Sequence, residues 1–193
     1  MAQSQSRAPL QRIDAPDAKA SASNPATFIF LHGLGDDADG WTNIAQQFHA
    51  ANKLPHLTWI FPNAPHNHEA MTQAWYTPTS FSPIPVGRSS AAVGAEAEEE
   101  EEEEDEEELL QSVEYICGLV DEEVKSGVDL KRIVIGGFSQ GCAMRVFRDA
   151  RARIGETVGE EALEVHEYEG LGHATSGTEF RDMCDFLETI VPQ

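Results

Sequence analysis

The stretch Arg132-Ile133-Val134-Ile135-Gly136-Gly137-Phe138-Ser139-Gln140-Gly141 decides the fold of this chain. Its three consecutive β-branched residues predict a short buried strand of a parallel sheet. Residues 137–141 fit G-x-S-x-G, a nucleophile elbow in which a strand turns sharply into a helix and exposes a serine hydroxyl. Side chains two residues on either side of Ser139 would collide with neighbouring strands, so glycine is required there. The alternative is a tight Gly/Ser turn without chemistry, and the strand before it favours the elbow.

The composition limits the class of protein. The 193 residues are enough for one domain with a sizeable core, and the formal charge is −21. Twelve acids lie within residues 96–108, so the rest of the chain carries the remaining −9. Phosphate contacts need clustered Lys and Arg, so we expect no nucleic-acid partner. Three widely spaced cysteines without a C-x-x-C pair indicate reduced thiols in an intracellular protein, and we expect neither metal nor cofactor.

The amino-terminal residues 1–24 are rich in Ala, Ser, Gln and Pro, which predicts a disordered tail before a single domain over residues 25–193. This tail has no apolar core of a signal peptide. No apolar run approaches the roughly 20 residues that span a bilayer. We therefore expect a cytoplasmic protein with at most transient contact with a membrane surface. Its oligomeric state stays open.

A glycine-rich loop follows the first predicted strand, Thr27 to Leu31. This loop, His32 to Asp37, can direct backbone N–H groups at a ligand, or it can be a plain connection from strand to helix. The elbow later in the chain favours the first interpretation. A helix over residues 41–51 and a second buried strand over residues 57–61 come next.

The middle of the chain is less regular. His66 and His68 have no carboxylate or cysteine partner at a suitable spacing, so we do not expect a metal there. Residues 69–87 form an aromatic, proline-containing segment that either roofs an apolar pocket or packs on the surface. Residues 88–108 predict a solvated acidic loop, with recruitment of a basic partner as the less favoured alternative. Its last acids can extend the next helix, which we expect over about residues 109–125.

After the elbow, the pattern predicts a helix over residues 143–154 and a strand over residues 164–168. Gly170-Leu171-Gly172-His173 follows that strand, which places His173 where a general base is expected. An amphipathic helix over residues 182–191 closes the chain. Strands and helices alternate throughout, so we predict an α/β fold with a mostly parallel sheet and helices on both faces.

Five pieces in this order resemble the acyl-protein thioesterase and lysophospholipase family of α/β-hydrolases. They are residues 30–36 (FLHGLGD), 61–65 (FPNAP), 74–76 (AWY), 137–141 (GFSQG) and 170–173 (GLGH). The resemblance implies a serine esterase of lipid and fatty-acid metabolism, in the cytoplasm and also the nucleus. Its substrates would be S-acylated proteins, as for a palmitoyl-protein hydrolase, or lysolipids and related esters. By position, Ser139 would be the nucleophile, His173 the base, and the backbone N–H groups of Leu34 and Gln140 the oxyanion hole.

The chain departs from this family after the elbow. Only 33 residues separate Ser139 from His173. A nucleophile helix, two strands, two further helices and the last strand need about 60, at about 5 residues per strand and about 11 per helix. We interpret the difference as an internal deletion that removes central-to-late strands between Met144 and Ala162.

This deletion would also remove the third member of the catalytic triad, an aspartate in the family. Asp149 and Glu156 are the nearest acids, but neither follows a predicted strand, so no triad acid is identified. The alternative function is therefore a catalytically impaired or inactive relative, either a pseudoenzyme or a mis-spliced product.

Overall fold

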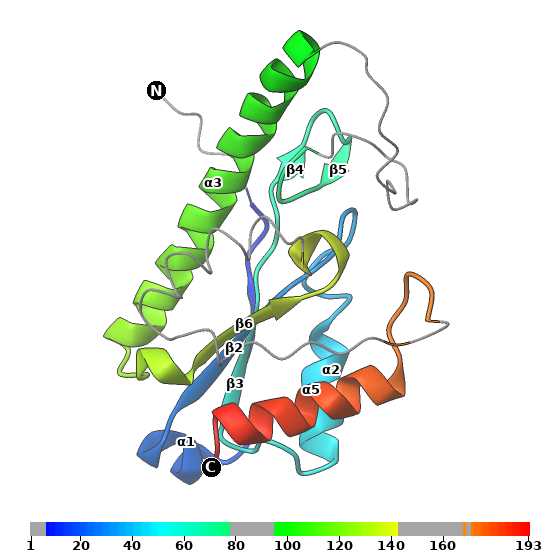
Figure 1. The fold of residues 1–193 in the computed structure, drawn as a ribbon. Coiled ribbons are helices and arrows are strands. Elements are labelled where there is room, and N and C mark those ends of the chain that lie inside the picture. Colours follow the sequence, from blue (N-terminus) through cyan, green and yellow to red (C-terminus); the bar gives the residue numbers. More distant parts are fainter. Residues whose placement is uncertain (1–6, 78–94, 143–167, 169–170) are drawn as a thin grey trace.

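The computed structural model describes residues 7–77, 95–142, 168 and 171–193 (Figure 1). The strands are β1 (Gln11–Ile13), β2 (Ala26–Leu31), β3 (Leu57–Phe61), β4 (His66–Asn67), β5 (Thr72–Gln73) and β6 (Ile133–Gly137). The helices are α1 (Ala18–Ser23), α2 (Thr42–Ala50), α3 (Ala95–Lys125) and α5 (Gly177–Ile190), with 3-10 turns η1 (Leu130–Arg132) and η2 (Ser139–Cys142).

The main sheet has the strand order β1-β3-β2-β6. β2 lies at its centre and pairs in parallel with β3 and β6, while β1 pairs antiparallel with β3. Phe28 of β2 lies opposite both Trp59 of β3 and Val134 of β6. β4 and β5 form a separate two-stranded hairpin. The predicted mostly parallel sheet, with buried strands at residues 26–31 and 57–61, is confirmed.

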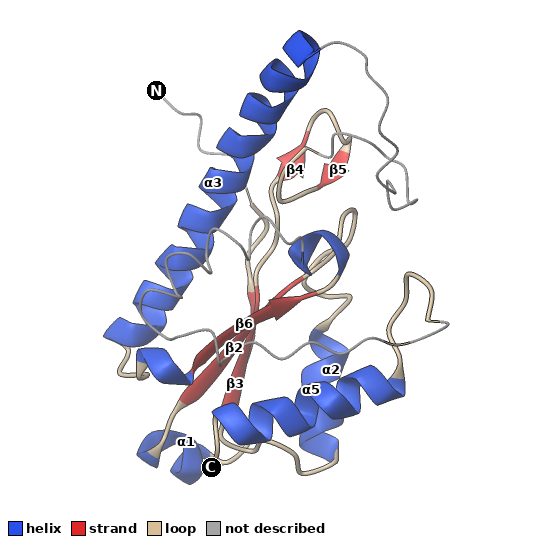
Figure 2. Cartoon of the chain, viewed as in Figure 1, coloured by secondary structure: helices blue, strands red, loops and turns tan. Residues whose placement is uncertain are grey.

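Helices cover both faces of this sheet, as predicted (Figure 2). Side chains alternate along a strand, so the apolar residues of β2 divide between two cores. Phe28 and Phe30 pack into the core that α2 and α5 cover, whereas Ile29 and Leu31 pack into the core beneath α3. Each such side chain contributes about 1.5–3 kcal/mol when fully buried. An apolar run of five residues is needed here because neither face of β2 meets water.

The prediction of a disordered tail is wrong for the part of residues 1–24 that forms β1 and α1. β1 is stabilised by contacts from distant segments. It pairs with β3, and Arg12 Nη1 lies 2.6 Å from the buried carboxylate of Glu123 on α3. A short edge strand held in this way carries no hydrophobic pattern that composition can reveal.

The prediction of an acidic loop over residues 88–108 is wrong from Ala95 onward, because α3 begins there. Glutamate is a good helix former, and negative charge is favourable at the amino-terminal end of a helix dipole. The predicted carboxyl end of this helix at Lys125 is confirmed. The predicted helix over residues 143–154, the proposed deletion, and the strand over residues 164–168 except Tyr168 lie outside the described residues.

Candidate active site

Ser139 lies at the sharp turn that follows β6. Its φ is 53°, a left-handed conformation that only a few per cent of non-glycine residues adopt. Phe138 N–H donates to Leu31 O at 2.9 Å, which ties the turn to the end of β2. A Cβ added at Gly137 or Gly141 would lie 2.5 or 2.4 Å from that same carbonyl oxygen. The predicted collision at these two positions is confirmed, and backbone carbonyls of β2 and its loop cause it.

The structure brings Ser139 and His173 together. His173 Nε2 lies 2.7 Å from Ser139 Oγ, and both residues lie at the solvent-facing end of the sheet. His173 is exposed and precedes α5 by a few residues. A capping box begins that helix: Ser176 Oγ accepts from Glu179 N–H, and the Glu179 carboxylate accepts from Ser176 N–H. This Ser-x-x-Glu signal lies in the sequence, but the predicted helix began only at residue 182.

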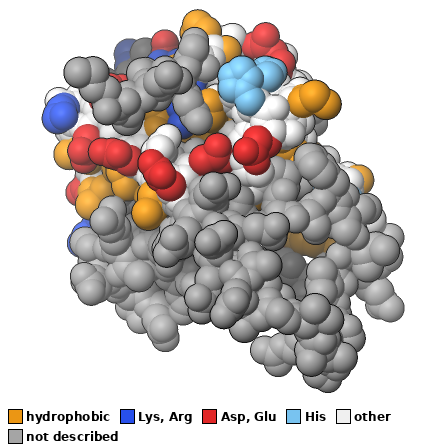
Figure 3. All heavy atoms as spheres, turned by 90° about the horizontal axis from the view of Figure 1, so that it is seen from above, with side chains coloured by type: hydrophobic (Ala, Val, Ile, Leu, Met, Phe, Trp, Pro, Cys, Tyr) orange, Lys and Arg blue, Asp and Glu red, His pale blue; other side chains and the backbone are white. Residues whose placement is uncertain are grey.

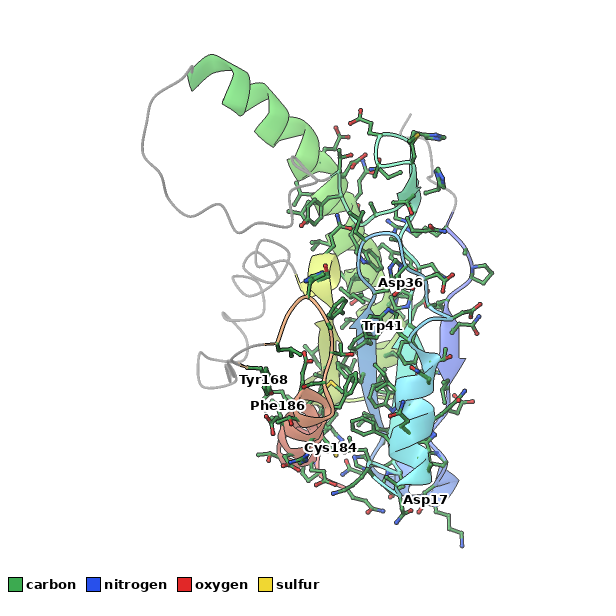
Figure 4. The ribbon with its side chains drawn as sticks, turned by 90° about the vertical axis from the view of Figure 1, so that its right-hand side faces the viewer. Asp17, Asp36, Trp41, Tyr168, Cys184 and Phe186 are labelled. Carbon is green, nitrogen blue, oxygen red and sulfur yellow. The ribbon has the colours of Figure 1, made fainter. Side chains whose placement is uncertain are left out.

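A row of aromatic rings leads from the core to His173. Trp41 lies 4.9 Å from Phe30 and 5.1 Å from Phe138, measured between ring centroids, and Phe138 lies 5.1 Å from the His173 ring. The Trp41 indole N–H donates to Asp36 Oδ2 at 2.7 Å, and Figure 4 shows these two residues side by side. Packing on Phe138 therefore gives the exposed imidazole one fixed neighbour besides Ser139.

The glycine-rich loop after β2 lies against Ser139. A Cβ on Gly33 would approach Ser139 Cβ to 3.2 Å, so the loop backbone is in close contact with the serine. Gly35, at a φ of 77°, donates its N–H to Gln73 O of β5 at 2.9 Å. Leu34 lies between these two points with its side chain 37% exposed. This places the Leu34 and Gln140 backbones on two adjacent connections beside Ser139.

His32 is a functional residue that the sequence did not reveal. Its ring is 1% exposed, Nε2 accepts from Ala64 N–H at 3.0 Å, and Nδ1 lies 2.7 Å from Gly33 O. Because Nε2 accepts, the proton must be on Nδ1, which donates to the Gly33 carbonyl. Burial lowers the pKa of His32, although the Gly33 carbonyl and the carboxylates of Asp36 and Asp37 oppose this shift. A neutral imidazole thus joins the glycine-rich loop to the connection after β3.

The third member of a triad is not seen among the described residues. Within residues 7–77, 95–142, 168 and 171–193, no carboxylate is hydrogen-bonded to the His173 ring, and Asp149 and Glu156 fall outside these ranges. The nearest described acid in sequence is Glu179, which is engaged in the helix cap. The absence of a triad acid remains a prediction.

No described cluster is a convincing metal site. The rings of His66 and His68 lie 5.5 Å apart on the exposed hairpin, and Figure 3 shows histidine side chains gathered on this face of the molecule. Within the described part of the chain, neither belongs to a group of three potential ligands. Cys184, Asp185 and Glu188 form one such group, but Glu188 is already paired with Lys53 at 2.9 Å.

Comparison with known proteins relates this geometry to a family. Residues 11–149 match the Phospholipase/Carboxylesterase family. The acyl-protein thioesterase 1 of Yarrowia lipolytica is 38% identical over 125 residues, which are 65% of this chain and 50% of that protein. The enzyme of the same name from Schizosaccharomyces pombe is 36% identical over 132 residues, 66% of this chain and 50% of that protein. The chain spans about half the length of the curated relatives it matches.

Solved structures show the same fold. Arabidopsis thaliana SOBER1 has a TM-score of 0.63 at 20% identity, covering 86% of this chain and 99% of that one. Zea mays acyl-protein thioesterase 2 has a TM-score of 0.61 at 17% identity, covering 95% and 99%. These similarities establish an α/β-hydrolase-type fold. In the described part of the chain, no helix is both long and apolar enough to cross a membrane.

Proposed function

The chain belongs to the phospholipase/carboxylesterase family, and from this premise we propose that it is a serine hydrolase that cleaves fatty-acyl thioesters from protein cysteines. The observation that carries the proposal is the 2.7 Å contact between His173 Nε2 and Ser139 Oγ at the elbow. Curated relatives named acyl-protein thioesterase favour a thioester substrate over the alternative of an inactive relative. Because the chain spans only half of them, its activity and substrates are part of the proposal.

In the proposed reaction, Ser139 Oγ attacks the thioester carbonyl carbon while His173 Nε2 takes the hydroxyl proton. The carbonyl oxygen becomes an oxyanion, which the backbone N–H groups of Leu34 and Gln140 would bind. The C–S bond then breaks, and His173 returns the proton to the departing cysteine sulfur. Water, deprotonated by His173, cleaves the resulting acyl-serine and releases the fatty acid. No cofactor is needed for these steps.

His173 would perform this proton transfer with less support than a complete triad gives. Loss of the triad acid lowers kcat by about 10⁴-fold in serine proteases, because the histidine loses its tautomer and orientation. Contact with Phe138 and the capped start of α5 limit the positions of the His173 ring. We propose that these contacts retain the orientation in part, so that slow turnover remains.

The finer assignments rest on the family resemblance. We propose a palmitoyl-protein hydrolase as the specific activity, with lysolipid or related ester hydrolysis as a second substrate class. We also propose a role in lipid and fatty-acid metabolism and a cytoplasmic location, with the nucleus as an additional site. Fractionation of cells that express a tagged full chain would test the location, and recovery only with membranes or organelles would contradict it.

The test of the proposed function is labelling of the purified full chain by a fluorophosphonate probe, together with hydrolysis of a palmitoyl-thioester substrate. We expect both reactions in the wild type and neither in Ser139→Ala. His173→Gln should lower both by at least about 100-fold, because the general base contributes about 10²–10⁴-fold. A folded wild-type chain that reacts with neither substance would favour the inactive alternative instead.

A further inference from the structure

Trp75, on the connection after β5, is bonded to three separate parts of the molecule. Its side chain is buried, at 3% exposed. The indole N–H donates to His32 O at 2.8 Å, and the backbone N–H donates to the side-chain Oε1 of Gln140 at 2.9 Å. Its backbone carbonyl accepts from Ser112 Oγ of α3 at 2.5 Å. One residue thus joins the loop after β2, the elbow and helix α3.

These bonds lie beside the two proposed oxyanion donors. His32 precedes Leu34 by two residues, and Gln140 is the second donor itself. The Gln140 side chain also donates from Nε2 to Tyr76 O at 2.8 Å, so both of its polar atoms are held by residues 75 and 76. The ladder between β2 and β6 ends at Leu31 opposite Gly137. Beyond that pair, Trp75 is the bridge between the two connections.

Helix α3 holds Trp75 from the outside. Besides the Ser112 bond, the carboxylate of Glu108 accepts from Thr77 N–H and Thr77 Oγ1, both at 2.7 Å, and from Asn67 Nδ2 at 3.0 Å. Glu108 and Ser112 are one helical turn apart on α3, so they present side chains to the same segment. The aromatic segment is therefore fixed at Trp75 and again two residues later.

We propose that Trp75 is a positioning residue that sets the separation of the Leu34 and Gln140 N–H groups in the oxyanion hole. The inference rests on the proposed function and deepens it. A donor helps only where it meets the charge that develops in the transition state, and a displacement of about 1 Å can cost about 100-fold in rate. Trp75 acts through His32 O and the Gln140 side chain and takes no part in the bond changes.

The experiment compares Trp75→Phe with Trp59→Phe in the full chain. Both substitutions remove an indole ring portion from the core, so both leave a similar cavity. The indole N–H of Trp59, which is 0% exposed, has no hydrogen-bond partner among the described residues. Its loss therefore breaks no bond, whereas Trp75→Phe breaks the bond to His32 O. The pair separates the hydrogen bond from the effect of a smaller core side chain.

In Trp75→Phe we expect kcat for the palmitoyl thioester to fall about 10–100-fold with KM within about twofold. Backbone amides of residues 32–36 and 139–142 should exchange hydrogen faster than in wild type. Trp59→Phe should keep kcat within about twofold and leave this exchange unchanged, even if its melting temperature falls. A merely structural role of Trp75 would lower stability without this split between kcat and KM.

Equal kcat in the two variants and equal exchange at both segments, with an active wild type, would overturn the role of Trp75 and leave the proposed function intact. A wild type without turnover or labelling would instead overturn the proposed function. In that case the exchange measurement decides alone: faster exchange in Trp75→Phe supports the bridge, and unchanged exchange overturns it.

Discussion

Gly141→Ala tests how closely the elbow is fitted to the strand beside it. The new Cβ would lie 2.4 Å from Leu31 O and 2.8 Å from His32 O, and both atoms belong to the backbone. The elbow must retreat by at least about 0.6 Å to reach a contact of 3.0 Å. Overpacking of this kind costs about 1–3 kcal/mol, and a shift of this size beside Ser139 should lower kcat about 30–100-fold.

Gly118→Ala is the matched control, because it adds the same methyl group where nothing lies within 4 Å. Gly118 is exposed in the interior of α3, so alanine should stabilise the chain by about 1 kcal/mol and leave turnover unchanged. Urea denaturation gives the free energies of unfolding, and thioester hydrolysis gives kcat. If Gly141→Ala retained wild-type stability and turnover, the close packing of the elbow against β2 would be refuted.

Three further results are expected. Glu123→Ala should lower the free energy of unfolding by about 2–4 kcal/mol, because it strands the buried Thr27 hydroxyl, 2.6 Å from the carboxylate, and removes the ion pair with Arg12; a loss below 1 kcal/mol would contradict this. Burial lowers the pKa of His32, so below about pH 6.5 the unfolded chain binds a proton that the native chain resists. Wild type should then lose stability on acidification to pH 5.5 that His32→Gln retains, and equal losses would exclude a neutral His32. Ser176→Ala should cost about 1 kcal/mol in thermal unfolding through the cap of α5, and an unchanged melting temperature would argue against that cap.

The sequence predicts the parts of the fold that local patterns control. The apolar runs of β2 and β3 mark buried strands, and the glycines around Ser139 mark a turn that admits no Cβ. His173 was predicted from its position after a strand-like pattern, and the structure brings it within 2.7 Å of Ser139 Oγ. Each of these signals is contained in a few consecutive residues, so a single sequence is enough to read it.

The remaining parts depend on contacts between distant segments. β1 has no apolar pattern and is held by Glu123, which is 111 residues from Arg12. Trp75 is bonded to His32 and Gln140 across 43 and 65 residues, and nothing near Trp75 in the chain indicates those partners. Such bonds form only after the sheet has assembled. They could be proposed from the sequence only by someone who already knew which connections meet at its edge.

The contact between Ser139 and His173 depends on two separately anchored parts of the same sheet. The elbow is fixed by the pairing of β6 with β2. His173 is fixed from its carboxyl side, because α5 buries Leu187 and Val191 in the core that contains Phe28. The end of α5 is held further, since a buried His56 donates from Nε2 to Val191 O at 2.7 Å.

Figure 4 shows Cys184 and Phe186 on α5, with Tyr168 beside that helix. The Tyr168 hydroxyl donates to Asp182 Oδ2 at 2.8 Å, so the chain before His173 also contacts α5. Residues on both sides of His173 are therefore attached to one helix that packs on the central sheet. It follows that the position of this imidazole relative to Ser139 is set chiefly by the docking of α5. A substitution in the core beneath α5 should consequently disturb the Ser139–His173 distance before it disturbs the elbow.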